Sequence, residues 1–378
     1  MKKLIFLLIL LLLVSCTNNT NQIYKKDKYF LGYIKDIDDN MVLLLNTEVN
    51  LTIVNNNYKE TLINAAKDSI TKYHKLLDSN HYYADEKGNK LNNIKVLNDN
   101  IGKGKVEVDP IIVDALKEAM VLTKITKGYF NITLGALSNL YKDKFLSYDS
   151  INTDPDKYDI DNVLLGIIQY EKIEDYIIID ETNNTVELKA NTNPYLIDLG
   201  AFSKGYILNK VYDELIKYNT SFLLTAGSSS IISYTNRDEK INWNIALKDP
   251  NTIDSQLLVF NLDNGAVSTS GDYENYYLLK DGTRRHHILN PYSGYSENFY
   301  RSISLLSNDA SIVDALSTAL FNISNKNEIK QIINDIENNY DTKIAYCILD
   351  NDNNLFINNY FNDTLKEKIN KNINIIVE

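Results

Sequence analysis

Residues 197–206 read IDLGAFSKGY, with an Asp, a glycine turn and a Lys set between apolar residues. Apolar residues precede this stretch and recur after it at helical spacing, which predicts a strand at 195–197, a turn at Gly200 and then a helix. Asp198 and Lys204 would lie near the helix N-terminus, where exposed amides and the helix dipole favour anions. The stretch therefore resembles a phosphate-and-metal site. An ordinary strand-turn-helix junction with Asp198 as the helix cap is the simpler alternative.

The rest of the chain alternates between helix and strand patterns. Helices are expected at 59–77, from Asp109-Pro110 to Lys127-Gly128, and at about 310–322. Strands are expected at 41–54 (one or two), 222–226, 242–247 and 257–262, in a hairpin that turns at Asn183-Asn184, and finally at 344–349. Residues 78–105 have no regular pattern, and 142–175 are the expected insertion or mobile lid. This mixed order predicts an α+β fold with mixed and antiparallel sheets and packed helices.

The N-terminus has the features of a bacterial lipoprotein signal. Lys2 and Lys3 precede an apolar run over 4–14, and Ser15 stands directly before Cys16. The run is shorter than the ~20 residues that span a bilayer and is typical of a cleavable signal. A plain secretory signal with an incidental cysteine is the alternative. We therefore expect a signal peptide over 1–15, lipidation such as palmitate at Cys16, a disordered tether over 16–40 and a catalytic domain over 41–378. We also expect export to the periplasm or cell exterior on the lipid anchor.

Composition excludes one class of partner. The net charge is −11 at pH 7 and would be −13 without Lys2 and Lys3, and the chain has no long basic run. Such a chain is unsuited to nucleic acid, so we expect no nucleic-acid partner. Cys347 is the only cysteine after Cys16, so the mature chain cannot form an intramolecular disulfide. The fold must therefore rest on its hydrophobic core.

Two downstream segments carry further side chains that suit chemistry. Residues 264–296 place the adjacent pair His286 and His287 between a Ser/Thr/Gly-rich turn and a Pro-Gly turn. Asp314 and Thr318 are four residues apart and share a helix face. A carboxylate and a hydroxyl on one face can offer oxygens to Mg²⁺, which takes few protein ligands. Taken singly, the histidines would suit a surface pair, and the carboxylate and hydroxyl an internal hydrogen bond.

The chain resembles the ApbE family, the FAD:protein FMN transferases, through four segments in order: DLGAFSKGY, GSSSI, TSGDYENYY with HHILNPYSG, and DASIVDALSTALF. The resemblance covers about Leu45 to Phe321 and implies the family's architecture, which is related to the T-fold. It implies that the chain binds FAD and Mg²⁺ and moves FMN onto a Thr or Ser hydroxyl of a target protein, releasing AMP. Family targets are typically membrane or periplasmic redox subunits, which a membrane anchor would suit.

The resemblance also assigns roles to residues. FAD would be contacted by Leu45, Tyr129, Phe130, Asn131, Asp198, Lys204 and Ile288. Mg²⁺ would be held by the backbone carbonyl of Ala201 and the side chains of Asp314 and Thr318. Asp314 and His287 would be catalytic, and a His287 that is neutral near pH 7 would help remove the proton of the acceptor hydroxyl. His286 is the less suitable neighbour. Asp314→Ala would abolish Mg²⁺-dependent turnover and leave the fold largely intact.

Some positions depart from the family pattern. Asn46 and Ser228 stand where the family usually has Gly. Asn131 and Asn290 stand where it usually has Asp. These exchanges are mostly polar and tolerant of size, so the resemblance survives them.

Asn80, Tyr82 and Tyr83 are candidates for the position at which the family packs an aromatic ring on the flavin. Asn80 there would loosen FAD and admit water in place of the protein hydroxyl. A Mg²⁺-dependent FAD pyrophosphatase, giving FMN and AMP, is therefore one alternative function. A non-catalytic FAD-binding lipoprotein is another, although it would have little need of Asp314 and Thr318. An unrelated solute-binding lipoprotein would explain the signal but not the four ordered motifs.

Overall fold

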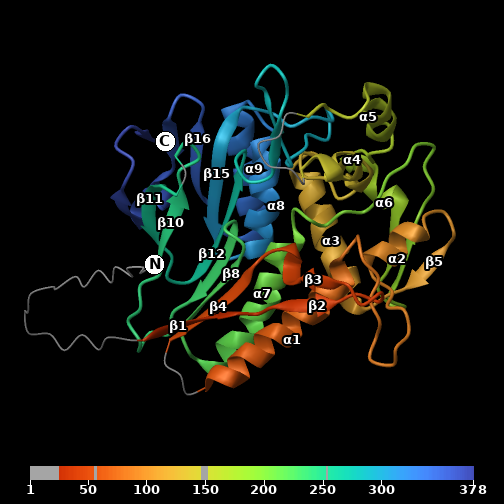
Figure 1. Ribbon diagram of the computed structural model, residues 1–378, viewed down its shortest axis with the longest axis horizontal. Helices are drawn as coiled ribbons and strands as arrows, with labels where there is room; N and C mark the ends of the chain where they lie inside the picture. Colours follow the sequence, from red (N-terminus) through yellow and green to blue (C-terminus); the bar gives the residue numbers. More distant parts are fainter. Residues whose placement is uncertain (1–24, 55–57, 146–151, 253) are drawn as a thin grey trace, which may run out of the picture.

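The computed structural model describes residues 25–54, 58–145, 152–252 and 254–378 (Figure 1). The expected signal peptide, the lipidation site Cys16 and the first part of the expected tether lie outside these residues. In the described part of the chain, no helix has both the length and the apolar character needed to cross a membrane.

The largest sheet runs through the middle of the molecule. Among the described residues its strands lie in the order β1 (Lys26–Phe30), β4 (Val49–Val54), β8 (Phe222–Ala226), β9 (Ser230–Tyr234), β12 (Gly265–Gly271), β15 (Tyr300–Ser307), β16 (Ala345–Asp350), β17 (Asn354–Ile357) and β19 (Asn374–Val377). Neighbouring strands pair antiparallel, except β17 and β19, which are parallel. The α+β class with mixed and antiparallel sheets is confirmed.

The two faces of this sheet bury different cores, because successive side chains on a strand point to opposite faces. Ala266 and Leu305 pack into the core beneath the helices. Their neighbours Val267 and Leu306 pack on the other side, against a small sheet. That small sheet consists of β10 (Asn244–Lys248), β11 (Gln256–Asn261) and β18 (Leu365–Lys368).

Helices cover the first face. These are α1 (Lys59–Leu77), α3 (Pro110–Ile125), α7 (Ser203–Leu215), α8 (Ala310–Phe321) and α9 (Lys326–Tyr340). α7 packs against both α1 and α8, and α8 lies on β12 and β15 (Figure 1). At Gly205 an added Cβ would lie 2.1 Å from the carbonyl oxygen of Ala310, so only glycine allows α7 to approach α8 this closely.

A smaller region lies beside α3, at the right of Figure 1. It contains α2 (Ile94–Asp99), α4 (Gly135–Tyr141), α5 (Lys157–Leu164), α6 (Ile173–Tyr176) and the sheet of β5 (Lys105–Glu107), β7 (Thr185–Leu188) and β6 (Ile177–Asp180). Elsewhere lie the pairs β2 (Tyr33–Lys35) with β3 (Met41–Leu43) and β13 (Tyr276–Leu278) with β14 (Arg284–His286), the short helix η1 (Leu44–Asn46), and α10 (Asn359–Thr364).

Several expected elements are confirmed almost to the residue. α1, α3, α8, β8, β10, β11 and β16 lie where the apolar patterns placed them, and β6 and β7 form the expected hairpin. Asp109 begins α3 because its carboxylate accepts a hydrogen bond from the Ile111 amide. Asn184 turns the hairpin with a φ of 48°, a left-handed conformation that Asn tolerates.

Other expectations were wrong. Residues 195–197 form only an isolated bridge, between Leu196 and Leu134, and not a strand. The range 78–105, expected to lack a regular pattern, contains α2. The insertion or lid expected at 142–175 stays a prediction; its described part contains α5 and most of α6. Further strands follow β16, so it is not the final one.

The expected tether over 16–40 extends too far. Its described part contains β1 and β2, and β1 pairs with β4 at the edge of the main sheet. The sequence of β1, KDKYF, has little apolar content of its own. Its position depends on hydrogen bonding to a neighbouring strand, which a local pattern does not reveal.

Candidate active site

One cavity of about 450 Å³ opens between α1, α7, α8 and the segment that follows β14. Every residue to which the resemblance assigned a role in FAD binding, metal binding or catalysis lines it: Leu45, Tyr129, Phe130, Asn131, Asp198, Ala201, Lys204, His287, Ile288, Asp314 and Thr318. Five separate segments of the chain therefore meet at one place. The volume is typical of a small-molecule site.

Asp314 is a buried carboxylate, with 4% of its surface exposed. One carboxylate oxygen accepts a hydrogen bond from the Gly205 amide (2.9 Å), and the other accepts from the hydroxyls of Ser268 (3.0 Å) and Ser230 (3.3 Å). These partners come from α7, β12 and β9, so the carboxylate joins α8 to three other elements. Asp314→Ala would leave three donors without an acceptor, so we expect a loss of stability beside the loss of turnover, and the expectation that the fold stays largely intact remains a prediction.

The N-terminus of α7 differs from the simple anion site that the sequence indicated. The Gly205 amide is occupied by Asp314 and is not open to a ligand. Asp198 does not cap α7, which begins at Ser203 without a side-chain cap; instead its carboxylate accepts from the Gly200 amide (2.8 Å) and shapes the turn. Within the described residues, no carboxylate forms an ion pair with Lys204. Its ammonium group therefore supplies a positive charge to the cavity.

The two adjacent histidines have different surroundings. His286 is fully buried, packs edge-on against Phe321 (5.2 Å between ring centres), and its Nε2 lies 2.7 Å from the carbonyl oxygen of Glu297. His287 follows the end of β14 and exposes its ring to the cavity. The surrounding cavity walls, and then the charge of Lys204, lower the pKa of His287. The ring is therefore neutral at pH 7, as a general base must be.

The residues expected to hold Mg²⁺ fit such an ion. Ala201, Asp314 and Thr318 offer a carbonyl, a carboxylate and a hydroxyl oxygen, which are the hard donors that Mg²⁺ prefers. Asp314 is buried, and in the described part of the chain no Lys, Arg or His side chain forms an ion pair with it. A buried carboxylate of this kind calls for a cation. The described residues contain no cluster of three His, Cys, Asp or Glu ligands, so substrate oxygens and water would complete the coordination.

Of the residues expected around the flavin, some are apolar, and Asn131 is polar but already hydrogen-bonded within the protein. Phe130 and Ile288 are buried, and Tyr129 packs edge-on against Tyr292 (5.2 Å between ring centres). The Asn131 side chain bonds the Ile168 carbonyl (2.9 Å) and the Thr133 amide and hydroxyl, so it supports the wall and has its amide occupied. The position of Asn131 is confirmed at the cavity, but its main contacts are internal.

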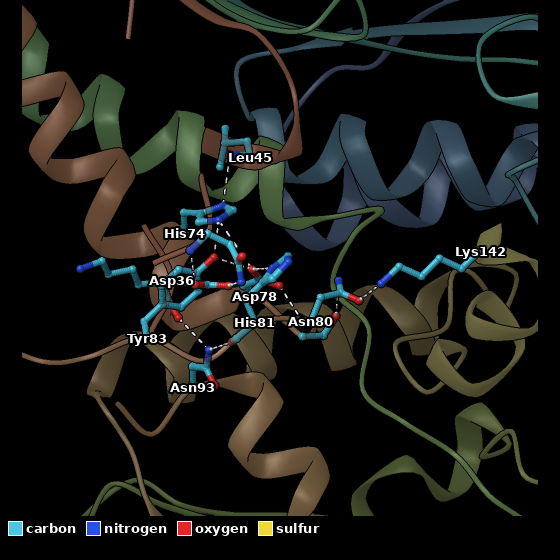
Figure 2. Close-up of polar contacts among 12 residues, drawn as sticks. Asp36, Leu45, His74, Asp78, Asn80, His81, Tyr83, Asn93 and Lys142 are labelled. Atoms are coloured by element: carbon cyan, nitrogen blue, oxygen red, sulfur yellow. Dashed lines mark hydrogen bonds and ion pairs between the residues drawn. The ribbon is translucent and has the colours of Figure 1, made fainter. Parts of the chain in front are cut away.

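The opposite wall contains a polar cluster that the sequence did not indicate (Figure 2). The Leu45 amide donates to Nδ1 of His74 (3.1 Å), so the ring proton of the neutral histidine lies on Nε2, which is 3.0 Å from the Tyr83 hydroxyl. That hydroxyl donates to Asp78 (2.7 Å), which also contacts His81 (2.8 Å). Burial lowers the pKa of His74 to about 4, against the opposing effect of Asp78. In this His74–Tyr83–Asp78–His81 cluster, a chain of hydrogen bonds therefore leads from the neutral His74 ring through the Tyr83 hydroxyl to the Asp78 carboxylate, which His81 also contacts.

The cluster supports an unusual backbone. Leu45 and Asn46 both have a φ of 55°, in the left-handed region that branched residues avoid. Asn tolerates this conformation, which explains why Asn46 can replace the family's Gly. The bond from Leu45 to His74 holds the segment against the cavity. Two of the four histidines, spaced seven residues apart and flanking Asp78, were the signal that could have revealed this wall.

Asn80, of the three candidates for the flavin-facing position, is the one that lines the cavity. Tyr83 is fully buried in the cluster, and the Tyr82 hydroxyl bonds Asp99, away from the cavity. The Asn80 amide nitrogen of the backbone donates to Asp78 (2.7 Å), and its side-chain oxygen accepts from Lys142 (3.1 Å; Figure 2). This wall therefore presents the Asn80 amide to the cavity.

Comparison with known proteins agrees with this arrangement. The ApbE family signature matches residues 45–342. The FAD:protein FMN transferase of Klebsiella pneumoniae (strain 342) is 31% identical over 231 residues, covering 60% of this chain and 67% of the relative, and that of Haemophilus influenzae is 26% identical over 57% of this chain and 61% of the relative. The chain thus spans about two thirds of the length of these relatives.

Among solved structures, the ApbE protein of Thermotoga maritima superposes with a TM-score of 0.67 at 25% identity, over 91% of this chain and 97% of that protein. The agreement therefore extends over nearly the whole fold, beyond the four motifs. The matched signature, the sequence relatives and the shared architecture together show that the chain belongs to the ApbE family.

Proposed function

We propose that the chain transfers FMN from FAD to a Thr or Ser hydroxyl of an acceptor protein, with Mg²⁺ bound at Asp314. One observation carries the proposal: Lys204, His287 and the α8 pair Asp314 and Thr318, which come from three segments remote in sequence, line a single cavity. A cation, a neutral base and an oxygen-rich metal position are the groups that cleavage of a pyrophosphate requires. The matched relatives are FAD:protein FMN transferases, which supports the same assignment.

The reaction divides among the chain's own residues as follows. Lys204 stabilises negative charge on the pyrophosphate oxygens, because its ammonium group has no carboxylate partner among the described residues. His287, neutral at pH 7, accepts the proton of the attacking hydroxyl. Ser268 and Ser230 hold the Asp314 carboxylate in one orientation by donating to it. A bound Mg²⁺ would neutralise charge on the phosphates and on the departing AMP.

A specific observation keeps a second function open, namely a Mg²⁺-dependent FAD pyrophosphatase. Asn80 lines the cavity, whereas Tyr82 and Tyr83 do not. An amide packs less tightly on a flavin than an aromatic ring does, which favours access of water to the same phosphorus. A non-catalytic FAD carrier is the less suitable alternative. Asp314 is buried and has no ion-pair partner among the described residues, which suits metal binding, whereas simple binding of FAD needs no metal ligand.

We also propose that the protein is exported and lipid-anchored through Cys16, and that its acceptor is a membrane or periplasmic redox subunit. The proposal rests on the sequence of residues 1–16. Cys16→Ala should move the protein from the membrane fraction to the soluble fraction, provided that export continues. Membrane association that is unchanged in this variant would contradict the anchor.

The function is tested by incubating the purified protein with FAD, Mg²⁺ and a peptide pool with one fixed Thr, and following the products by mass spectrometry. A peptide that gains the mass of FMN, with AMP released, supports the transferase. Free FMN and AMP in equal amounts with and without peptide would identify the pyrophosphatase. Intact bound FAD under all conditions would overturn both enzymatic functions. Omission of Mg²⁺ with EDTA present tests the metal, and full activity there would contradict its role.

A further inference from the structure

A second cavity of about 270 Å³ lies directly beside the first. The two share part of their walls, including Asn80, Asp198 and His287. The groups assigned to the phosphates and the metal, Lys204 and Asp314, line only the larger cavity. His287 therefore stands at a junction, with the phosphate site on one side and a separate space on the other.

We propose that this second cavity binds the segment of the acceptor protein that carries the reactive Thr or Ser, an inference that rests on the transferase activity proposed above. In phosphoryl transfer the attacking and leaving oxygens lie roughly in line on opposite sides of the phosphorus. A nucleophile must therefore approach from a side that the leaving AMP does not occupy. The second cavity provides such a side, and it delivers the hydroxyl to His287.

The step balances with the groups already named. The acceptor hydroxyl oxygen bonds to the FMN phosphorus, and its proton passes to His287. The bond from that phosphorus to the bridging oxygen breaks, and AMP departs with the bridging oxygen and the electron pair. No oxidant or reductant takes part. Only the reactive hydroxyl of the acceptor therefore needs to pass His287 and reach the phosphate site.

The lining of the second cavity suits a peptide. α4 and the residues after it contribute Ser138, Asn139 and Lys142, and the opposite side contributes Asn80. Side-chain amides and hydroxyls can pair with both the N–H and the C=O groups of an extended segment. The Asn139 side chain is exposed and has no hydrogen bond to another described residue, so it is available to such a segment. Lys142 donates to the Asn80 side chain and keeps these two walls together (3.1 Å).

The test fills the second cavity without touching the first. Asn139→Trp places an indole at an exposed position that lines only the second cavity. Asp143→Trp is the matched control, since Asp143 is exposed, lies four residues further along and lines neither cavity. Asn139→Ala removes the amide and leaves the space open. Each full-length variant is assayed for FAD affinity by flavin fluorescence, and for labelling of a pool of twelve-residue peptides with a fixed central Thr and randomised flanks.

We expect Asn139→Trp to lower kcat/KM for peptide labelling by about tenfold or more, with FAD affinity within about twofold of the wild type. Asp143→Trp should behave like the wild type, and Asn139→Ala should keep more activity than Asn139→Trp. Unchanged labelling by Asn139→Trp would overturn the inference and leave the transferase intact. A parallel loss of FAD affinity would also overturn it, because part of FAD would then occupy this cavity. If the wild-type protein labels no peptide, the proposed transferase itself fails.

Discussion

The two walls of the cavity of about 450 Å³ differ in where their polar side chains are directed. The wall of α7, α8 and His287 directs Lys204 and His287 into the cavity, with no ion pair to Lys204 among the described residues. The wall at 74–83 directs its polar groups at one another, and His74, Tyr83 and Asp78 satisfy each other. Lys204 thus keeps its charge for a ligand, whereas His74, Tyr83 and Asp78 use their polar groups to support the wall. Asp314, which accepts hydrogen bonds from three other elements, combines both roles.

The largest expected effect comes from Asp314→Ala, on the first wall. Turnover should fall by about 1,000-fold, because the charge that would hold the proposed Mg²⁺ is lost. The free energy of unfolding should also fall by about 1–3 kcal/mol, since the Gly205 amide and two serine hydroxyls lose their acceptor. Turnover is measured as AMP release, and stability by urea denaturation.

Asp314→Asn is the matched control for shape, and should lose turnover with a smaller loss of stability. Full Mg²⁺-dependent turnover in either variant would contradict the metal site. A loss of stability without a loss of turnover would place Asp314 with the supporting residues and break the comparison of the walls.

His287→Ala should slow the transfer step about 100-fold and leave FAD affinity nearly unchanged, because the proposed role of the ring is to accept a proton. Since its pKa is lowered, the neutral form should persist below pH 6.5, and wild-type activity should fall only as the pH drops through that lowered value. Single-turnover rates between pH 5 and pH 8, taken with FAD titrations, check both points. A large loss of FAD affinity with an unchanged single-turnover rate would exclude the base role.

Tyr83→Phe tests the second wall. It removes the hydroxyl shared by His74 and Asp78, and should lower the free energy of unfolding by about 1–3 kcal/mol. Tyr82→Phe is the matched control, because its hydroxyl bonds the partly exposed Asp99 outside the cluster and should matter less. Urea denaturation compares the two variants. Equal stability of both would show that the cluster does not support the wall.

The smallest effect is the pH dependence of stability from His74. Its pKa is about 4 in the folded chain and about 6.5 when unfolded, so between these values the unfolded chain binds more protons. The neutral ring therefore contributes fully above pH 6.5, and its contribution is lost as the pH falls toward 4. At pH 6 the loss should be about 1 kcal/mol or less.

His74→Gln removes this titration and should flatten the slope of stability between pH 6.5 and pH 5. His286, whose burial lowers its pKa to about 3, adds a slope of the same sign and remains in the variant as an internal reference. Identical slopes in wild type and His74→Gln would mean that the buried ring does not titrate as the geometry implies.

The helices and strands that depend on local pattern could be predicted from the sequence. α1 and α3 were placed because their apolar residues repeat at helical spacing, and Asp109-Pro110 marks a helix start chemically. β1 could not be placed, because its short polar sequence is held by pairing with β4. The segment at 195–197 is the opposite case: its apolar sequence predicts a strand, but Tyr195 and Ile197 pack into the core and only an isolated bridge forms.

The site residues divide in the same way. Lys204, His287, Asp314 and Thr318 were identified from their motifs, and the structure brings all of them to one cavity. The partners of Asp314 were not identified, because they come from three other elements. Nor could the sequence decide which residue near position 80 lines the cavity, since that depends on the hydrogen bond to Asp78 that keeps Tyr83 in the interior.

The sequence by itself determined the family, the fold class and the chemical groups of the candidate site, because these follow from periodicity and from ordered motifs. Only the tertiary structure decided that the Asp314 carboxylate occupies the N-terminus of α7, that His74 holds Leu45 in a left-handed conformation, and that His287 stands between two cavities. These features depend on side chains remote in the sequence meeting at hydrogen-bonding distance. Such contacts arise from packing, which no local pattern specifies.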